Sequence, residues 1–196
     1  MKNRLMKFLG SLVLVAALPC FAGSVKDSRD GQKYKTVKIG NQEWMAQNLN
    51  YKTNNSWCYE DKPINCQKYG RLYNWNAAQK ACPAGWHLPS EKEFSDLINL
   101  TGGEKVAGKN LKSKNDWDDE GNGKDAFGFA ALPAGRRDNK DSSGYMSEAA
   151  VFWSSTKSDF FEDLANMLKL SSERKIANLS FGSRTFGFSV RCLKNH

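Results

Sequence analysis

The clearest alternation of apolar and polar positions in the chain lies between residues 90 and 100. Four apolar residues recur there at the spacing of one helix face: Phe94, Leu97, Ile98 and Leu100. Ser90 and Glu93 form the sequence of a capping box in front of this stripe, and Gly102 with Gly103 can end it. The pattern therefore predicts an amphipathic helix that starts after Ser90.

A rigid corner is expected immediately before this helix, in residues 82–90. Pro83 and Gly85 turn the backbone there, because proline fixes φ and glycine allows positive φ. A preceding helix is predicted from Leu72 to Ala81, where apolar side chains recur at helical spacing. Its Trp75 is expected to reach the core.

Strand-like patterns occupy most of the remaining chain. Residues 34–39 alternate apolar and polar side chains, Gly40 and Asn41 supply a tight turn, and residues 43–46 return as a second strand. Five further strands are predicted, at 127–132, 151–155, 165–170, 176–181 and 186–192. The connecting segments are polar loops at 48–69 and 138–146, and 102–115, which can hold a short third helix. The fold class is α+β, with two helices packed against short, twisted antiparallel strands.

The N-terminus has the order of regions typical of an export signal. Three basic residues precede an uncharged apolar run from Phe8 to Leu18, which is too short to span a bilayer, and small residues follow it. We predict a signal peptide over 1–22, a flexible lead-in over 23–30 and a single domain over 31–194. The alternative is a lipid on Cys20, which would anchor the chain to a membrane.

Cleavage after Ala22 would leave four cysteines, and an even number in an exported chain indicates disulfides. Cys58 and Cys66 flank a turn-prone stretch, so a local bridge between them is natural. Cys82 and Cys192 would then close nearly the whole domain, which stabilises it by about 4 to 5 kcal/mol in the chain-entropy model. A metal site built from all four cysteines lacks the expected CxxC spacing.

The charge of the chain argues against nucleic-acid binding. The formal net charge is +8, and it falls to +5 when the three basic residues of the predicted signal are left out. Basic residues are spread along the sequence, with no run longer than a pair such as Arg136-Arg137. Nucleic-acid surfaces need clustered basic residues, so we expect no nucleic-acid partner.

Little in the sequence indicates catalysis or a metal site. His87 is the only histidine in the body of the chain, with no nucleophile or carboxylate at a meaningful spacing, and we expect it to pack or hydrogen-bond at the corner. The acidic segment 115–125 imitates the start of a calcium-binding loop, but Phe127 stands where a bidentate glutamate is needed. We predict no enzyme activity, no cofactor and no metal.

The six tryptophans favour a carbohydrate ligand, because sugar rings stack on aromatic faces. Four of them lie in apolar or turn-rich contexts typical of a core: Trp44, Trp75, Trp86 and Trp153. Trp57 and Trp117 lie in polar loops and are expected to be more exposed. The candidate ligand-binding residues are Trp117, Asp118, Asp119 and Asn122, since carboxylate and amide groups beside a stacking ring can bind sugar hydroxyls. We expect the contact surface to include the loop at 138–146 as well.

Three arginines receive structural interpretations. Arg136 and Arg137 could grip an anionic ligand, but are expected instead to pair with nearby carboxylates. Arg191 follows Val190 in a predicted core strand and is interpreted as a structural ion-pair partner.

Six blocks in a fixed order carry a family resemblance: residues 39–49, 70–75, 82–90, 128–135, 152–156 and 189–192. Together they resemble the Fibrobacter succinogenes major paralogous domain over about Gly31 to Lys194. The resemblance implies an exported bacterial domain, often carried on surface lipoproteins, with no established molecular role.

A more distant similarity links residues 88–94 and 187–191 to the formylglycine-generating-enzyme and sulfatase-modifying families. These families share an overall plan with C-type lectin-like domains, so the similarity implies a disulfide-stabilised fold of that type. The sequence departs from the enzymes because their late pair of reactive cysteines is missing, and Cys192 stands alone.

The first hypothesis is therefore an exported, non-enzymatic module that binds polysaccharide or another surface component, in the periplasm or at the cell surface. The alternatives are a structural or accessory domain without a small ligand, and an enzyme of the sulfatase-modifying type. Membrane contact is expected only if Cys20 carries a lipid.

Overall fold

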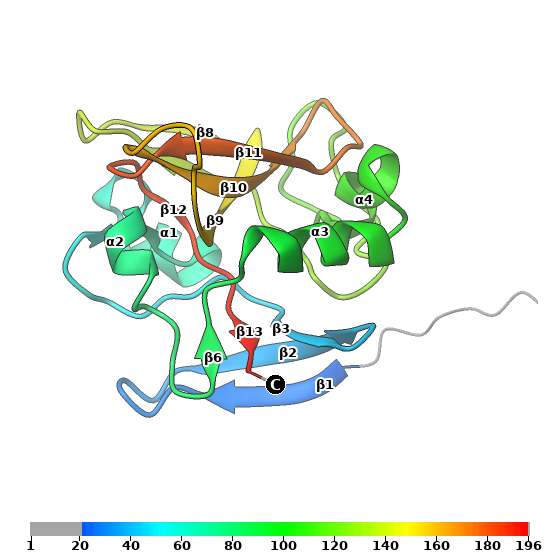
Figure 1. Ribbon diagram of the computed structural model, residues 1–196, viewed down its shortest axis with the longest axis horizontal. Coiled ribbons are helices and arrows are strands. Elements are labelled where there is room, and N and C mark those ends of the chain that lie inside the picture. Colours follow the sequence, from blue (N-terminus) through cyan, green and yellow to red (C-terminus); the bar gives the residue numbers. More distant parts are fainter. Residues whose placement is uncertain (1–20, 196) are drawn as a thin grey trace, which may run out of the picture.

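The computed structural model describes residues 21–195, and it contains two curled β-sheets and short helices (Figure 1). Two disulfides link parts of this fold. The predicted signal peptide, including Cys20, lies outside the described residues except for residues 21 and 22. The α+β class is confirmed. Within residues 21–195, no helix is long and apolar enough to cross a membrane.

The first sheet has five strands, in the order β1 (Phe21–Lys26), β2 (Lys33–Ile39), β3 (Gln42–Met45), β13 (Leu193–Lys194) and β6 (Trp86–His87). The main path of the second sheet is β11 (Asn178–Ser183), β10 (Leu164–Ser171), β9 (Ala149–Lys157), β12 (Phe188–Ser189), β5 (Leu72–Tyr73) and β4 (Ser56–Trp57). A hairpin of β7 (Ala134–Arg137) and β8 (Ser143–Met146) joins it because β7 pairs with β9.

The helices are the 3₁₀-helix η1 (Tyr59–Asp61), α1 (Pro63–Tyr69), α2 (Trp75–Ala78), α3 (Glu91–Leu100) and α4 (Glu104–Leu111). The predicted helix after Ser90 is confirmed as α3, and both hydrogen bonds of its capping box with Glu93 are present. Figure 1 shows α3 between the two sheets, where it buries Phe94, Leu97 and Ile98. The short helix expected in 102–115 is α4.

Residues 72–81 do not form the single helix that the apolar spacing predicted. Leu72 and Tyr73 are strand β5, paired with β4 and β12, and the Asn74 side chain then caps the one-turn helix α2. Pairing with strands distant in the sequence overrides the local periodicity here. Trp75 is buried as expected, together with Tyr73.

Two other segments differ from their predictions. The flexible lead-in expected at 23–30 is wrong for residues 23–26, because they belong to β1 and pair antiparallel with β2. Residues 127–132 are not a strand. Gly128 and Ala130 adopt positive φ there, which breaks an extended conformation, and one isolated bridge joins Ala131 to Lys112.

Aromatic side chains fill the core on both faces of β9. Phe152 points toward α3 and contacts Phe129, which in turn contacts Trp44. Trp153, its neighbour in sequence, points to the opposite face and packs on Phe188 with ring centroids 4.3 Å apart. The prediction that Trp44, Trp75, Trp86 and Trp153 are core residues is confirmed.

The final strands complete both sheets. β12 lies between β9 and β5, whereas β13 lies between β3 and β6. The predicted disulfides are confirmed: Cys82–Cys192 ties the corner to the segment between these strands, and Cys58–Cys66 spans the start of α1.

Arg191 lies between β12 and β13 and is fully buried. The ion pair expected for it is wrong, because its guanidinium donates hydrogen bonds to neutral oxygens instead: the Asn48 side chain and the carbonyls of Met45 and Phe129. Burial lowers the pKa of Arg191 to about 9, although the charge of Asp125 opposes this shift. The guanidinium therefore stays charged at neutral pH, as a structural hydrogen-bond donor.

Candidate binding site

The acidic segment 115–125 does not present Trp117 to solvent. The Trp117 side chain is only 5% exposed, and its indole N–H donates to the Ser113 hydroxyl at 3.0 Å and to the Ala131 carbonyl at 3.2 Å. The Lys112 ammonium lies 4.8 Å from the ring centroid. The prediction that Trp117 is an exposed stacking residue is therefore wrong, because its ring is buried and its indole N–H is hydrogen-bonded within the protein.

Of the other residues predicted to bind a ligand in this segment, one has a hydrogen bond within the protein and two are exposed to solvent. The Asn122 side chain accepts a hydrogen bond from the Trp117 backbone N–H at 3.1 Å, so it holds the turn closed. Asp118 and Asp119 are exposed and lie outside the buried contact made by Trp117. The structure thus brings Trp117 and Asn122 together in one turn. Among residues 21–195, no group of three or more His, Cys, Asp or Glu side chains could hold a metal ion.

The segment at 138–146 behaves differently, because it ends in a hairpin strand that carries an exposed ring. Arg136 of β7 lies opposite Gly144 of β8 in the antiparallel register, and Tyr145 follows with its side chain 50% exposed. Gly135 has a φ of +67°, and a Cβ at this position would collide with the Gly144 carbonyl. Glycine is therefore required for β7 to approach β8 this closely.

Tyr145 itself has a φ of +64°, a left-handed conformation that is unusual for a bulky aromatic residue. Such a conformation costs on the order of 1 to 3 kcal/mol and persists only where the surroundings impose it. Here Gly144 and Met146, on either side of Tyr145, pair with Arg136 and Ala134 of β7, and the Tyr145 ring lies at the surface beside Arg136.

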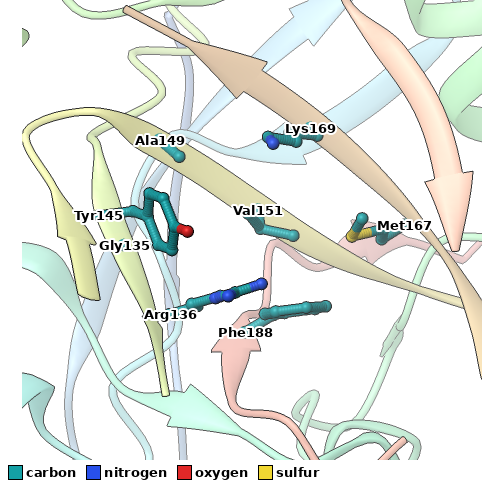
Figure 2. A pocket seen from close by; sticks show the side chains of 8 residues that line it. All are labelled: Gly135, Arg136, Tyr145, Ala149, Val151, Met167, Lys169 and Phe188. Carbon is teal, nitrogen blue, oxygen red and sulfur yellow. The ribbon is translucent and has the colours of Figure 1, made fainter. Parts of the chain in front are cut away.

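This ring stands at the rim of a small cleft of about 110 Å³ (Figure 2). The cleft lies on the face of β9 and β10 that points away from α3. Val151 and Lys169 are paired across these strands, and Met167 lies two residues from Lys169 on the same face. With Phe188 of β12, these side chains give the cleft an apolar floor and one cationic rim.

Arg136 supplies a second cation. Its guanidinium carbon lies 4.7 Å from the Tyr145 ring centroid and 5.2 Å from that of Phe186. Figure 2 shows the side chain extending between Tyr145 and Phe188, with Lys169 beyond Val151. The expectation that Arg136 pairs with a carboxylate is wrong: in the described part of the chain it makes cation–π contacts and no ion pair.

Arg137, the next residue, is paired as expected. Its guanidinium contacts the Asp61 carboxylate at 2.9 Å and the Asp141 carboxylate at 3.2 Å. The pKa of Asp138 is lowered chiefly by hydrogen bonds from the backbone N–H groups of Ser142 and Lys140. The positive charge of Arg136 lowers it by a smaller amount. The acidic groups of the hairpin are thus engaged by other donors.

Other candidate groups have structural partners. His87 hydrogen-bonds to the Asn195 side chain at 2.8 Å and to the Glu93 carboxylate at 2.9 Å, which confirms its expected role at the corner. A larger polar cavity of about 400 Å³ lies between β2, α1 and the segment 125–132. The tyrosine in its wall, Tyr34, is buried, and Lys68 on its rim is paired with Asp116. That cavity offers no exposed ring for stacking.

The fold and the cleft together define a disulfide-bonded α+β domain with an aromatic and cationic depression on one sheet face. Residues 37–194 match the family model of the Fibrobacter succinogenes major domain. Since this match spans most of the chain, the protein belongs to that family. No curated protein and no solved structure matches the chain significantly.

Proposed function

We propose that this protein is a non-enzymatic binding module that contacts a polysaccharide or another cell-surface component through the cleft between β7, β8, β9 and β10. The observation that carries this proposal is the half-exposed Tyr145 ring, held in a strained conformation against Arg136 over an apolar floor. Strained residues concentrate at functional sites, and an exposed ring beside unpaired donors suits a sugar, which has apolar C–H faces and polar hydroxyls.

We propose an exported location as well. Both disulfides are of the kind that persist in oxidising compartments. Cleavage after Ala22 would retain Gly23–Lys26, the part of β1 that pairs most regularly with β2. The intact mass of the protein recovered from its native host should correspond to a chain that begins at Gly23. A mass that corresponds to a chain starting at a lipid-bearing Cys20 would contradict this.

A relation to C-type lectin-like and sulfatase-modifying folds is part of the same proposal. It is supported by the bridge between Cys82 and Cys192, which joins the corner to the C-terminal strands. Comparison of an experimental structure with members of those folds tests it, and a different strand order in the shared core would refute it.

The function is tested by affinity electrophoresis against a polysaccharide panel that includes cellulose. We expect retention of the wild type by at least one polymer and a loss of about tenfold in affinity for Tyr145→Ala, because a stacking aromatic contact contributes on the order of 1 kcal/mol or more. Phe160→Ala is the matched control, since Phe160 is more exposed than Tyr145 and lies outside the cleft.

Equal retention of Tyr145→Ala and wild type would place any binding elsewhere. Retention by no polymer would favour the alternative, a structural or accessory domain without a small ligand. An enzyme of the sulfatase-modifying type would instead reveal itself by a formylglycine or hydroxylated product on candidate peptides, for which the chain offers no free cysteine among residues 21–195.

A further inference from the structure

We infer that the ligand of this cleft is an acidic polysaccharide whose sugars carry carboxylates, as uronic acids do. The inference rests on the proposed function, because it names the ligand class of the same cleft. It comes from the charges that the cleft leaves unpaired.

Arg136 is prepared to bind an anion. A planar guanidinium carries five N–H donors in a fork that matches a carboxylate. In the described residues, the contacts of this group are the rings of Tyr145 and Phe186, which orient the plane but accept none of its conventional hydrogen bonds. Its donors are therefore available, and its orientation is already fixed before a ligand arrives.

The contrast with Arg137 shows that the free state of Arg136 is a property of the fold. Both arginines belong to β7, and the alternation of the strand sends them to opposite faces. Arg137 meets the carboxylates of Asp61 and Asp141, whereas Arg136 meets aromatic rings. The hairpin has thus neutralised one of its two adjacent cations and left the other at the cleft.

Lys169 adds a second positive charge across the cleft. It is exposed on β10, opposite Val151, and among the described residues its ammonium has no ion-pair partner. None of the side chains that line the cleft is acidic: Gly135, Arg136, Tyr145, Ala149, Val151, Met167, Lys169 and Phe188. Two cations around an apolar floor complement a sugar ring that bears a carboxylate, and they disfavour a cationic ligand.

The size of the cleft limits how the polymer binds. Its volume of about 110 Å³ is small beside the roughly 400 Å³ of the polar cavity between β2 and α1. The cleft can therefore receive one face of a single sugar and its carboxylate, while the rest of the chain lies across the sheet surface. Weak single contacts of this kind gain strength when several modules bind one polymer.

The test uses the disulfide-bonded mature protein and three uronate polymers: polygalacturonate, alginate and glucuronoxylan. Each is paired with its carboxyl-reduced form, in which the carboxylate has become a neutral hydroxymethyl group. Affinity electrophoresis should show retention by at least one acidic polymer and a loss of about tenfold or more on carboxyl reduction, because a charge-assisted bidentate contact disappears.

Arg136→Gln and Lys169→Gln should each weaken retention by the acidic polymer and have little effect on its reduced form. Lys105→Gln is the charge-matched control, because Lys105 is exposed on α4, away from the cleft. Dextran sulfate reports non-specific charge attraction, which should respond equally to Lys105→Gln and to Lys169→Gln.

The outcomes separate this inference from the proposed function. Equal retention by acidic and reduced polymers, still dependent on Tyr145, would overturn the acidic ligand and leave a neutral-sugar module. Retention by neither form would overturn the inference, and a cellulose or other neutral polymer retained by the wild type would still uphold the function. Retention that is insensitive to both Arg136→Gln and Lys169→Gln would also refute the inference.

Discussion

Two polar segments of this protein, 115–125 and 138–146, each carry one aromatic residue, and the fold treats these residues in opposite ways. Trp117 turns inward, with its indole N–H bonded to Ser113 and Ala131. Tyr145 turns outward and contacts the Arg136 guanidinium at the edge of a cleft. Both segments contain aspartate and glycine, so composition does not distinguish them.

The difference lies in what each segment borders. Residues 115–125 follow α4 and fold back on it through backbone bonds such as that between Lys124 N–H and the Lys109 carbonyl, so Trp117 finds acceptors from the core. Tyr145 belongs to a hairpin strand that pairs with β7, and half of its side chain is exposed. A ring whose polar atom is satisfied by the protein is structural, whereas an exposed ring beside unpaired donors is a candidate contact.

The largest expected effect separates the two rings by stability. Trp117→Ala should lower the free energy of unfolding by roughly 3 to 5 kcal/mol, because it removes a buried aromatic side chain and leaves a cavity. Tyr145→Ala should change it by less than about 1 kcal/mol, since half of that side chain is already exposed.

Urea unfolding of both variants measures this difference. A small effect of Trp117→Ala together with a large effect of Tyr145→Ala would reverse the assignment of the two rings.

A smaller effect concerns the buried cation beneath Trp117. The Lys112 ammonium donates to the carbonyls of Ser171, Ser172 and Arg174, and burial, helped by the charge of Lys109, lowers its pKa to about 8. The folded state then releases the proton at lower pH than the unfolded state, whose lysine has its ordinary pKa of 10.5. Stability should therefore rise between about pH 8 and pH 10.

Urea midpoints across this range test the sign of the effect. Lys112→Met should be less stable than the wild type at neutral pH and should lose the rise. The range stops at pH 10 because burial raises the pKa of Tyr34 from 10.0 to about 12. Above pH 10 this tyrosine loses its proton in the unfolded state and keeps it in the folded state, so a further rise in pH favours unfolding. A flat profile for the wild type would show that Lys112 keeps its proton in the folded protein.

The smallest effect is expected from the carboxylates of the acidic segment. Asp118 and Asp119 are exposed, so Asp118→Asn and Asp119→Asn should each change stability by no more than about 0.5 kcal/mol. Retention on polysaccharide should be unchanged in both variants. Weaker retention with an unchanged melting temperature would return the acidic segment to the binding surface.

The elements that the sequence predicts well are those fixed by neighbouring residues. The helix α3 follows from a capping box and an apolar stripe, both contained within residues 90–100. The apolar spacing in 72–81 predicts a helix where the first two residues form a strand, because Leu72 and Tyr73 pair with β4 and β12. The second of these strands lies more than a hundred residues away. The disulfides follow from counting cysteines and from the short separation of Cys58 and Cys66.

The cleft is harder to predict because its walls come from β7, β8, β9, β10 and β12. The sequence predicts that the loop at 138–146 belongs to a contact surface, but it does not reveal which of Arg136 and Arg137 has carboxylate partners. That depends on η1, which places Asp61 beside Arg137 from far earlier in the chain. Strand alternation around the Arg136-Arg137 pair was the available signal, since adjacent residues of a strand face opposite sides.

The position of β12 and β13 has a consequence for how the protein is made. Each of these short strands occupies an interior place in its sheet, yet both come from the C-terminal part of the domain and are made after the strands that they join. Until residues 188–194 emerge, β9 and β5 lack the strand between them, and β3 and β6 are likewise separated. Both sheets thus become continuous only when residues 188–194 take their places, and the Cys82–Cys192 bridge can then lock this arrangement.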